Sequence, residues 1–145
     1  MKIYVASSWR NESQPHVVST LRSAGFHVYN FREPEEGNSG FHWSEIGPDW
    51  QSWSPEKLRD GLKHPIAQSG FNLDKQALDS SDVCVLVLPC GRSAHLEAGY
   101  IAGQGKRVFV LLSDGEPELM YGLTTELCLC LGEVIDKLVE TPNAD

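Results

Sequence analysis

Two short apolar runs with a helix-length segment between them constrain the fold of this chain more than any other feature. The runs are residues 83–88 and 108–112, and the helix-length segment, residues 93–104, lies between them. Short apolar runs bounded by turn residues are typical of buried strands, and the segment between them has the length of a helix. A strand, a helix and a second strand in succession form a parallel βαβ unit. The chain is therefore expected to contain a parallel sheet.

The same alternation continues along the rest of the chain. Further strands are expected at residues 2–6, 26–31 and 127–130, and further helices at residues 15–24, 65–80 and 132–140. Right-handed crossovers limit the strand order, and five parallel strands favour the flavodoxin-like doubly wound order 2-1-3-4-5. The length of 145 residues suits one domain. The sequence therefore predicts an α/β fold in a single domain, residues 1–145, with a long, aromatic-rich, irregular insert at residues 32–63 after strand 2.

Charge and composition exclude several classes of function. The chain has 12 basic and 20 acidic residues and a net charge of −8, whereas binding to long nucleic acid needs a basic surface. No run of 18 apolar residues occurs, and the first residues lead into a strand without a signal-peptide pattern. The four cysteines form no CxxC pair, and the five histidines are scattered. We expect a cytoplasmic protein with reduced thiols, no metal, no cofactor and no membrane partner.

Two polar loops follow the strands at which the winding of this sheet reverses. In the order 2-1-3-4-5, strands 1 and 3 are neighbours, and ligands bind in the crevice at their carboxyl ends. The loops there are residues 7–11 and 89–94. We expect these loops to contact the substrate, with these candidate residues: Ser7, Ser8, Trp9, Arg10, Gly91, Arg92 and Ser93.

Three familiar catalytic patterns fail in this region. Residues 91–95 resemble a nucleophile elbow, but His95 stands in place of the second glycine and no histidine follows it. The pair at residues 105–106 resembles the end of a phosphate loop, but Tyr100 stands where the first glycine belongs. A GxGxxG fingerprint is absent from the sequence.

The remaining candidate is the carboxylate of Glu97. It follows Ser93, the expected N-cap, by four residues, so it is expected about one turn into its helix, where the helix dipole favours an ionised carboxylate. A purely helix-stabilising role is the alternative. Asp74 lies eight residues before Asp82, roughly 12 Å back along a helix, and a six-residue strand covers roughly 20 Å. Asp74 could therefore lie near the carboxyl half of strand 3, or it could be a solvated surface residue.

Two carboxyl groups in one site are what enzymes use to cleave a glycosidic bond with retention of configuration. One attacks the anomeric carbon, and the other serves as acid and base for the leaving group or the acceptor. A role without catalysis is also open, since a sheet domain of this kind could bind a small ligand without converting it. Turnover of the bound ligand distinguishes the two.

Three stretches of the sequence resemble the nucleoside 2-deoxyribosyltransferase family. They are residues 2–9, the helix that contains Asp74, and residues 81–99 followed by the pair at 105–106. The most specific part is a strand, a Gly/Ser loop and then Glu-Ala-Gly on a helix. The resemblance implies a flavodoxin-like fold, cleavage of N-glycosidic bonds in nucleosides or nucleotides, and a homodimer or larger homo-oligomer. It also implies Glu97 as covalent nucleophile, Asp74 as acid/base or sugar-positioning residue, and Tyr4 as a residue lining the site.

One departure from the family pattern leaves a second activity open. Some transferases carry an aspartate six residues before the nucleophile, where this chain has Gly91. A related branch hydrolyses nucleoside 5′-monophosphates and holds the phosphate with serine and arginine side chains. The serines and arginines of the two crevice loops fit that pattern. All four tryptophans lie in the first of these loops or in the insert, where they either stack on a base or anchor the insert.

Overall fold

The computed structural model describes residues 1–140, in two compact units. The first, which we call the sheet unit, comprises Met1–Asn30 and the chain from Leu78 onward. The second, the insert unit, comprises Phe31–Ala77. The single domain expected over residues 1–145 includes five residues outside the described part, and it stays a prediction.

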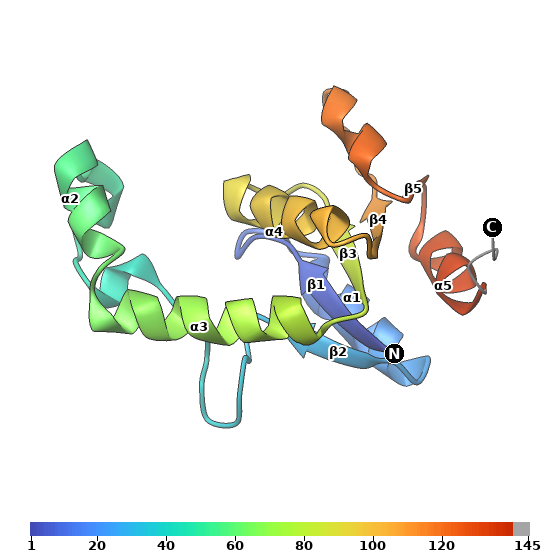
Figure 1. Cartoon of the computed structure of the whole chain (residues 1–145), viewed down its shortest axis with the longest axis horizontal. Coiled ribbons are helices and arrows are strands. Elements are labelled where there is room, and N and C mark those ends of the chain that lie inside the picture. Colours follow the sequence, from blue (N-terminus) through green and yellow to red (C-terminus); the bar gives the residue numbers. More distant parts are fainter. Residues whose placement is uncertain (141–145) are drawn as a thin grey trace. The chain divides into compact units, whose positions relative to one another are not determined.

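The sheet unit has the predicted strand order. Within residues 1–140 five parallel strands form one sheet in the order β2-β1-β3-β4-β5 (Figure 1). The strands are β1 (Lys2–Ala6), β2 (His27–Asn30), β3 (Val83–Val87), β4 (Arg107–Leu111) and β5 (Glu126–Cys128). Because β1 and β3 are neighbours and the chain winds away from them in opposite directions, their carboxyl ends form the switch point. The doubly wound α/β fold is therefore confirmed.

The two faces of the sheet bury different side chains. On one face Ile3, Val85 and Phe109 belong to the main apolar core, together with residues of α1 (Gln14–Ser23) and α5 (Leu131–Val139). Strand side chains alternate between faces, so Tyr4 and Leu86 point to the opposite face. There α4 (Arg92–Gly103) packs against β1, β3 and β4. The helix between β3 and β4 thus lies across three strands of the sheet.

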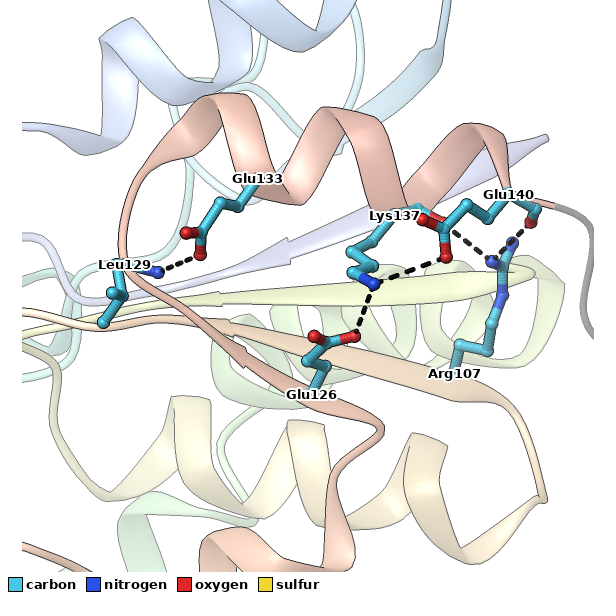
Figure 2. A network of polar contacts seen from close by, with 6 residues as sticks. All are labelled: Arg107, Glu126, Leu129, Glu133, Lys137 and Glu140. Atoms are coloured by element: carbon cyan, nitrogen blue, oxygen red, sulfur yellow. Dashed lines mark hydrogen bonds and ion pairs between the residues drawn. The ribbon is translucent and has the colours of Figure 1, made fainter.

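Polar contacts fix α5 to the edge of the sheet that β4 and β5 form (Figure 2). Arg107 Nη1 donates to the carbonyl oxygens of Lys137 at 3.2 Å and Glu140 at 3.3 Å, which lie at the end of α5. Lys137 Nζ lies 3.4 Å from Glu126 Oε2 and 3.5 Å from Glu140 Oε2. Carbonyls of the last helical turn have no partner within the helix, so the Arg107 guanidinium satisfies groups that would otherwise depend on water.

The insert unit contains more regular structure than the sequence predicts. It holds two 3₁₀ turns, η1 (Trp43–Glu45) and η2 (Trp50–Ser52), a helix α2 (Pro55–Gly61), and most of α3 (Pro65–Ser80). The expectation that residues 32–63 are irregular is therefore wrong at α2. Ser54 caps this helix by accepting a hydrogen bond from Lys57 N at 3.2 Å, and proline occupies the first helical turn. A serine at the N-cap and a proline in the first turn are both ordinary signals for the start of a helix.

Three aromatic side chains pack against one another in the insert unit. The ring centroids of Phe41 and Trp43 are 4.8 Å apart, and those of Trp43 and Trp53 are 5.8 Å apart, both in edge-on arrangements. Gly61 packs so closely that a Cβ added there would lie 2.6 Å from a ring atom of Trp53. Trp43 and Trp53 therefore anchor the insert, which is the structural interpretation of the two that the sequence leaves open.

Candidate active site

The two crevice loops are tied to each other by buried side chains. Ser7 Oγ donates to the Val87 carbonyl at 2.9 Å, and Asn11 Nδ2 donates to the Pro89 carbonyl at 3.0 Å. Both side chains are buried, at 7% and 4% exposure. The hydrogen bond from the Ser7 hydroxyl thus connects the end of β1 to the end of β3. Asn11 was not among the predicted site residues, although its place in a polar crevice loop is a signal for such a role.

Tyr4 and Glu97 meet directly. Tyr4 lies in the middle of β1, fully buried, and its phenol donates a hydrogen bond to Glu97 Oε2. The Tyr4 ring also stacks on Tyr29 of β2, with centroids 5.2 Å apart and an interplanar angle of 22°. Because Tyr4 points to the face that α4 covers, the phenol and the carboxyl come together from two elements far apart in the sequence. Their roles in chemistry stay predictions.

The position of Glu97 in its helix differs from the expected one. The N-cap of α4 is Gly91, whose backbone is extended, and no side chain caps the helix. Helical structure begins at Arg92, so Ser93 is not the N-cap and Glu97 is in the second turn. The effect of the helix dipole falls off within the first turn. The dipole therefore contributes less to the charge of Glu97 than the sequence suggests.

Burial controls the protonation of Glu97. The side chain is half-buried, and this desolvation raises the pKa of the carboxyl from an ordinary 4.5 to about 8. The Tyr4 phenol favours the ionised form by its hydrogen bond, but the loss of hydration outweighs it. At pH 7 the protonated form predominates, contrary to the ionised carboxylate expected from the dipole. Carboxyl groups whose pKa is strongly shifted occur often at functional sites.

Most of the other predicted site residues are exposed to solvent. Arg10, Gly91, Arg92 and Ser93 are exposed, and within residues 1–140 no hydrogen bond or ion pair holds either arginine side chain. Beside Gly91 the space is open, since an added Cβ would meet no atom within 4 Å. Two further candidates, Ser8 and Trp9, are half-buried and exposed respectively.

Asp74 belongs to the other unit. It lies on α3 within the insert unit and is half-buried. Its pairing with Glu97 and its role as acid and base stay predictions.

Sequence reasoning missed a hydrogen-bonded histidine at the start of α4. His95 Nδ1 lies 2.7 Å from the Gly91 carbonyl oxygen, and its Nε2 lies 2.9 Å from the hydroxyl of Tyr121. Cys90 Sγ is 3.7 Å from the same Nδ1. Burial raises the pKa of the Cys90 thiol to about 11, so the thiol is neutral and no cysteine–histidine nucleophile forms at neutral pH. No local pattern links residues 95 and 121, because their contact arises from the fold.

Neither a metal site nor a membrane helix is present in the described part of the chain. Among residues 1–140, no group of three or more histidine, cysteine, aspartate or glutamate side chains is arranged to hold a metal ion. In the same residues no helix has the length and apolar character needed to cross a bilayer.

These elements define a flavodoxin-like α/β fold in which a buried tyrosine contacts a half-buried glutamate on the face of the sheet that α4 covers. Two solved structures share the fold over nearly the whole chain. The 2-deoxyribosyltransferase from the psychrotolerant bacterium Bacillus psychrosaccharolyticus superposes with a TM-score of 0.66 at 23% identity, covering 94% of this chain and 91% of that one. The CMP N-glycosidase BcmB from Clostridium botulinum superposes with a TM-score of 0.51 at 16% identity, covering 95% and 98%. At these identities the likeness shows the fold.

Comparison of the sequence itself with known proteins gives no match. No family model matches the chain, and no curated protein matches it significantly.

Proposed function

We propose that this chain is a nucleoside 2-deoxyribosyltransferase-like enzyme that cleaves the N-glycosidic bond of nucleosides or 2′-deoxynucleosides through a covalent glycosyl intermediate on Glu97. The observation that carries the proposal is the hydrogen bond from the buried Tyr4 phenol to the half-buried Glu97 carboxyl. The shared fold of a 2-deoxyribosyltransferase and a CMP N-glycosidase supports it. Fold alone does not determine function, so the pair of residues is the stronger support.

The proposed first step breaks the bond between the sugar and the base. Because Tyr4 holds Oε2, we assign the attack on the anomeric carbon to Glu97 Oε1. As the new carbon–oxygen bond forms, the electron pair of the glycosidic bond leaves with the base, and Asp74 as acid supplies the proton that the base needs. The attack requires ionised Glu97, and the departure of the base requires Asp74 to carry its proton, so both protonation states must be present together for turnover.

The second step releases the sugar. A water molecule or a second base attacks the same anomeric carbon, the bond to Glu97 breaks, and the carboxylate is regenerated. Asp74, now deprotonated, accepts the proton of the attacking group. Water gives net hydrolysis, and a second base gives transfer.

A nucleoside 5′-monophosphate N-glycosidase is the alternative that one further observation favours. Arg10 and Arg92 follow the neighbouring strands β1 and β3, and both side chains are exposed and unpaired within residues 1–140. Guanidinium groups bind phosphate oxygens well because their donors match the geometry of the anion. A domain that binds a nucleotide without turning it over is the third possibility.

A chromatographic screen of nucleosides and their 5′-monophosphates, with and without a second free base, tests these assignments. A new nucleoside formed only with the second base supports the transferase. Free base released in its absence supports the hydrolase. Binding of a nucleotide without release of base from any compound would overturn the proposed catalysis. It would support a domain that binds a nucleotide without turning it over.

A further inference from the structure

The first turns of α4 are fixed from two opposite sides. Successive residues of an α-helix are about 100° apart, so Glu97 and His95 lie about 200° apart around the axis. Glu97 reaches Tyr4 on β1, whereas His95 reaches Tyr121 in η3 (Leu119–Leu123), the 3₁₀ segment between β4 and β5. Since Gly91 provides no side-chain cap, the imidazole of His95 is the polar side chain that fixes this end of the helix.

The hydrogen bonds determine which ring nitrogen of His95 carries the proton. The Gly91 carbonyl can only accept, so the Nδ1 atom 2.7 Å away must donate to it. In the neutral imidazole Nε2 is then an acceptor, and the Tyr121 hydroxyl at 2.9 Å donates to it. A continuous chain of donors and acceptors therefore runs from the phenol of Tyr121 through the ring to the N-cap of α4.

Tyr121 is itself fixed to the sheet. Its carbonyl accepts hydrogen bonds from the backbone N–H of Thr124 at 3.0 Å and from the Thr124 hydroxyl at 2.6 Å. The next residue, Thr125, donates its backbone N–H to Val108 O at 2.8 Å, and its hydroxyl accepts from Val108 N at 2.8 Å. The His95–Tyr121 hydrogen bond thus connects the start of α4 to β4, while Glu97 meets β1.

We propose that the hydrogen bond between His95 and Tyr121 positions Glu97 for catalysis by fixing the rotation and axial position of the first turns of α4. His95 and Tyr121 are positioning residues in this proposal, which rests on the proposed function of Glu97. A small rotation of α4 would move the carboxyl away from the Tyr4 phenol. Misplacement of a reacting group by a fraction of an ångström lowers the rate of the chemical step more than it weakens substrate binding.

Two substitutions each remove the hydrogen bond between His95 and Tyr121, one by changing the donor and the other by changing the acceptor. Tyr121→Phe keeps the ring and loses the hydroxyl. In His95→Asn the side-chain amide nitrogen takes the place of Nδ1 and still donates to the Gly91 carbonyl, but the side chain is too short to reach Tyr121. We expect each variant to lower kcat by about tenfold with KM changed by less than about twofold. The double variant should lose no more than either single one, because both remove the same interaction; multiplying losses would overturn the proposal.

A matched control lies on the same helix. The Tyr100 hydroxyl donates to Asp79 Oδ1 at 2.5 Å, beyond the second turn of α4. Tyr100→Phe also removes one phenolic hydrogen bond from α4 but leaves its start in place, so we expect kcat to stay unchanged. An equal loss of kcat in Tyr100→Phe and Tyr121→Phe would show general loosening of the helix and overturn a specific role for His95 and Tyr121.

Amide hydrogen exchange tests the positioning role independently of turnover. Exchange at residues 92–98 should be faster in Tyr121→Phe than in the unmodified protein and unchanged in Tyr100→Phe. If the unmodified protein releases no base from any compound in the screen, the proposed function fails while the exchange result still decides whether the contact fixes α4. Unchanged exchange in Tyr121→Phe would overturn the positioning role even in an active enzyme.

Discussion

Glu97 combines two properties that work against each other. Its carboxyl is removed from water, which favours the neutral form, and it receives a hydrogen bond from Tyr4, which favours the ionised form. A nucleophile that must lose its proton in such surroundings costs folding stability at high pH. This residue therefore permits tests both of chemistry and of stability.

Replacing Glu97 by glutamine should stabilise the protein increasingly as the pH rises. Burial raises the pKa of the folded carboxyl to about 8 from 4.5, so its contribution to stability is full below the unfolded pKa and is lost as the pH rises through the folded one. Glutamine stays neutral throughout. Between about pH 5 and about pH 9 the free energy of unfolding of Glu97→Gln should gain at least about 1 kcal/mol relative to the unmodified protein.

Urea unfolding at both pH values measures this difference. Glu116→Gln, a change at an exposed carboxyl in a loop, serves as control and should show no such gain. The same Glu97→Gln protein should release no base. A pH-independent difference in stability would contradict the raised pKa, and undiminished turnover would contradict the covalent mechanism.

The pH dependence of turnover tests the contact between Tyr4 and Glu97. If the ionised carboxylate attacks while Asp74 still carries its proton, kcat/KM should rise with pH near pH 8, the pKa to which burial raises the carboxyl. Tyr4→Phe removes a donor that favours the ionised form, so the rising limb should move to higher pH. Profiles from about pH 6 to about pH 10 for both proteins provide the comparison. Superimposable limbs would show that the phenol does not influence the ionisation that limits catalysis.

At the scale of elements, α5 depends on one guanidinium more than on its surface ion pairs. Arg107 satisfies two backbone carbonyls at the end of the helix. Arg107→Ala should lower the free energy of unfolding by about 1 kcal/mol. Glu126→Gln removes only the partly exposed pair with Lys137 and should cost less than about 0.5 kcal/mol. Urea unfolding of both variants measures the two losses of stability. Equal losses would show that the hydrogen bonds from Arg107 to the carbonyl oxygens stabilise the protein no more than the surface ion pair does.

Local patterns account for most of these elements. The strand order is predictable because each apolar run is short and each helical segment between runs is long enough for a right-handed crossover. The start of α4 is not predictable in this way, because serine is a better N-cap side chain than glycine. The extended backbone at Gly91 nevertheless places the N-cap two residues before Ser93. The density of glycine and proline in the insert also obscured α2, despite the helix-start pair Ser54-Pro55.

The candidate site is only partly accessible to sequence reasoning. Glu97 is a candidate because it lies on the helix that follows β3, whereas Tyr4 is a candidate only through the resemblance of residues 2–9 to the nucleoside 2-deoxyribosyltransferase family. The contact of His95 with Tyr121 depends on the path of the 14 residues between β4 and β5, which no periodicity specifies. Partners of this kind follow from tertiary packing.

At the scale of the whole molecule, the charge of −8 opposes an anionic substrate. A nucleoside 5′-monophosphate would therefore need local cations, which Arg10 and Arg92 could provide from two neighbouring loops. If the substrate is a monophosphate, Arg10→Ala should raise its KM by about tenfold or more while the KM of the matching nucleoside changes little. Arg59→Ala, an exposed arginine on α2, is the control. Equal changes in KM for the two substrates would contradict the proposal that the enzyme hydrolyses nucleoside 5′-monophosphates.

The distribution of tryptophan separates the two units spectroscopically. Trp43, Trp50 and Trp53 all lie in the insert unit, whereas the sheet unit carries a single indole, the exposed Trp9. Intrinsic fluorescence of the chain is accordingly dominated by residues 31–77, while far-ultraviolet circular dichroism also registers the five strands. An emission change without a matching dichroism change would indicate that residues 31–77 lose their aromatic packing while the parallel sheet remains folded.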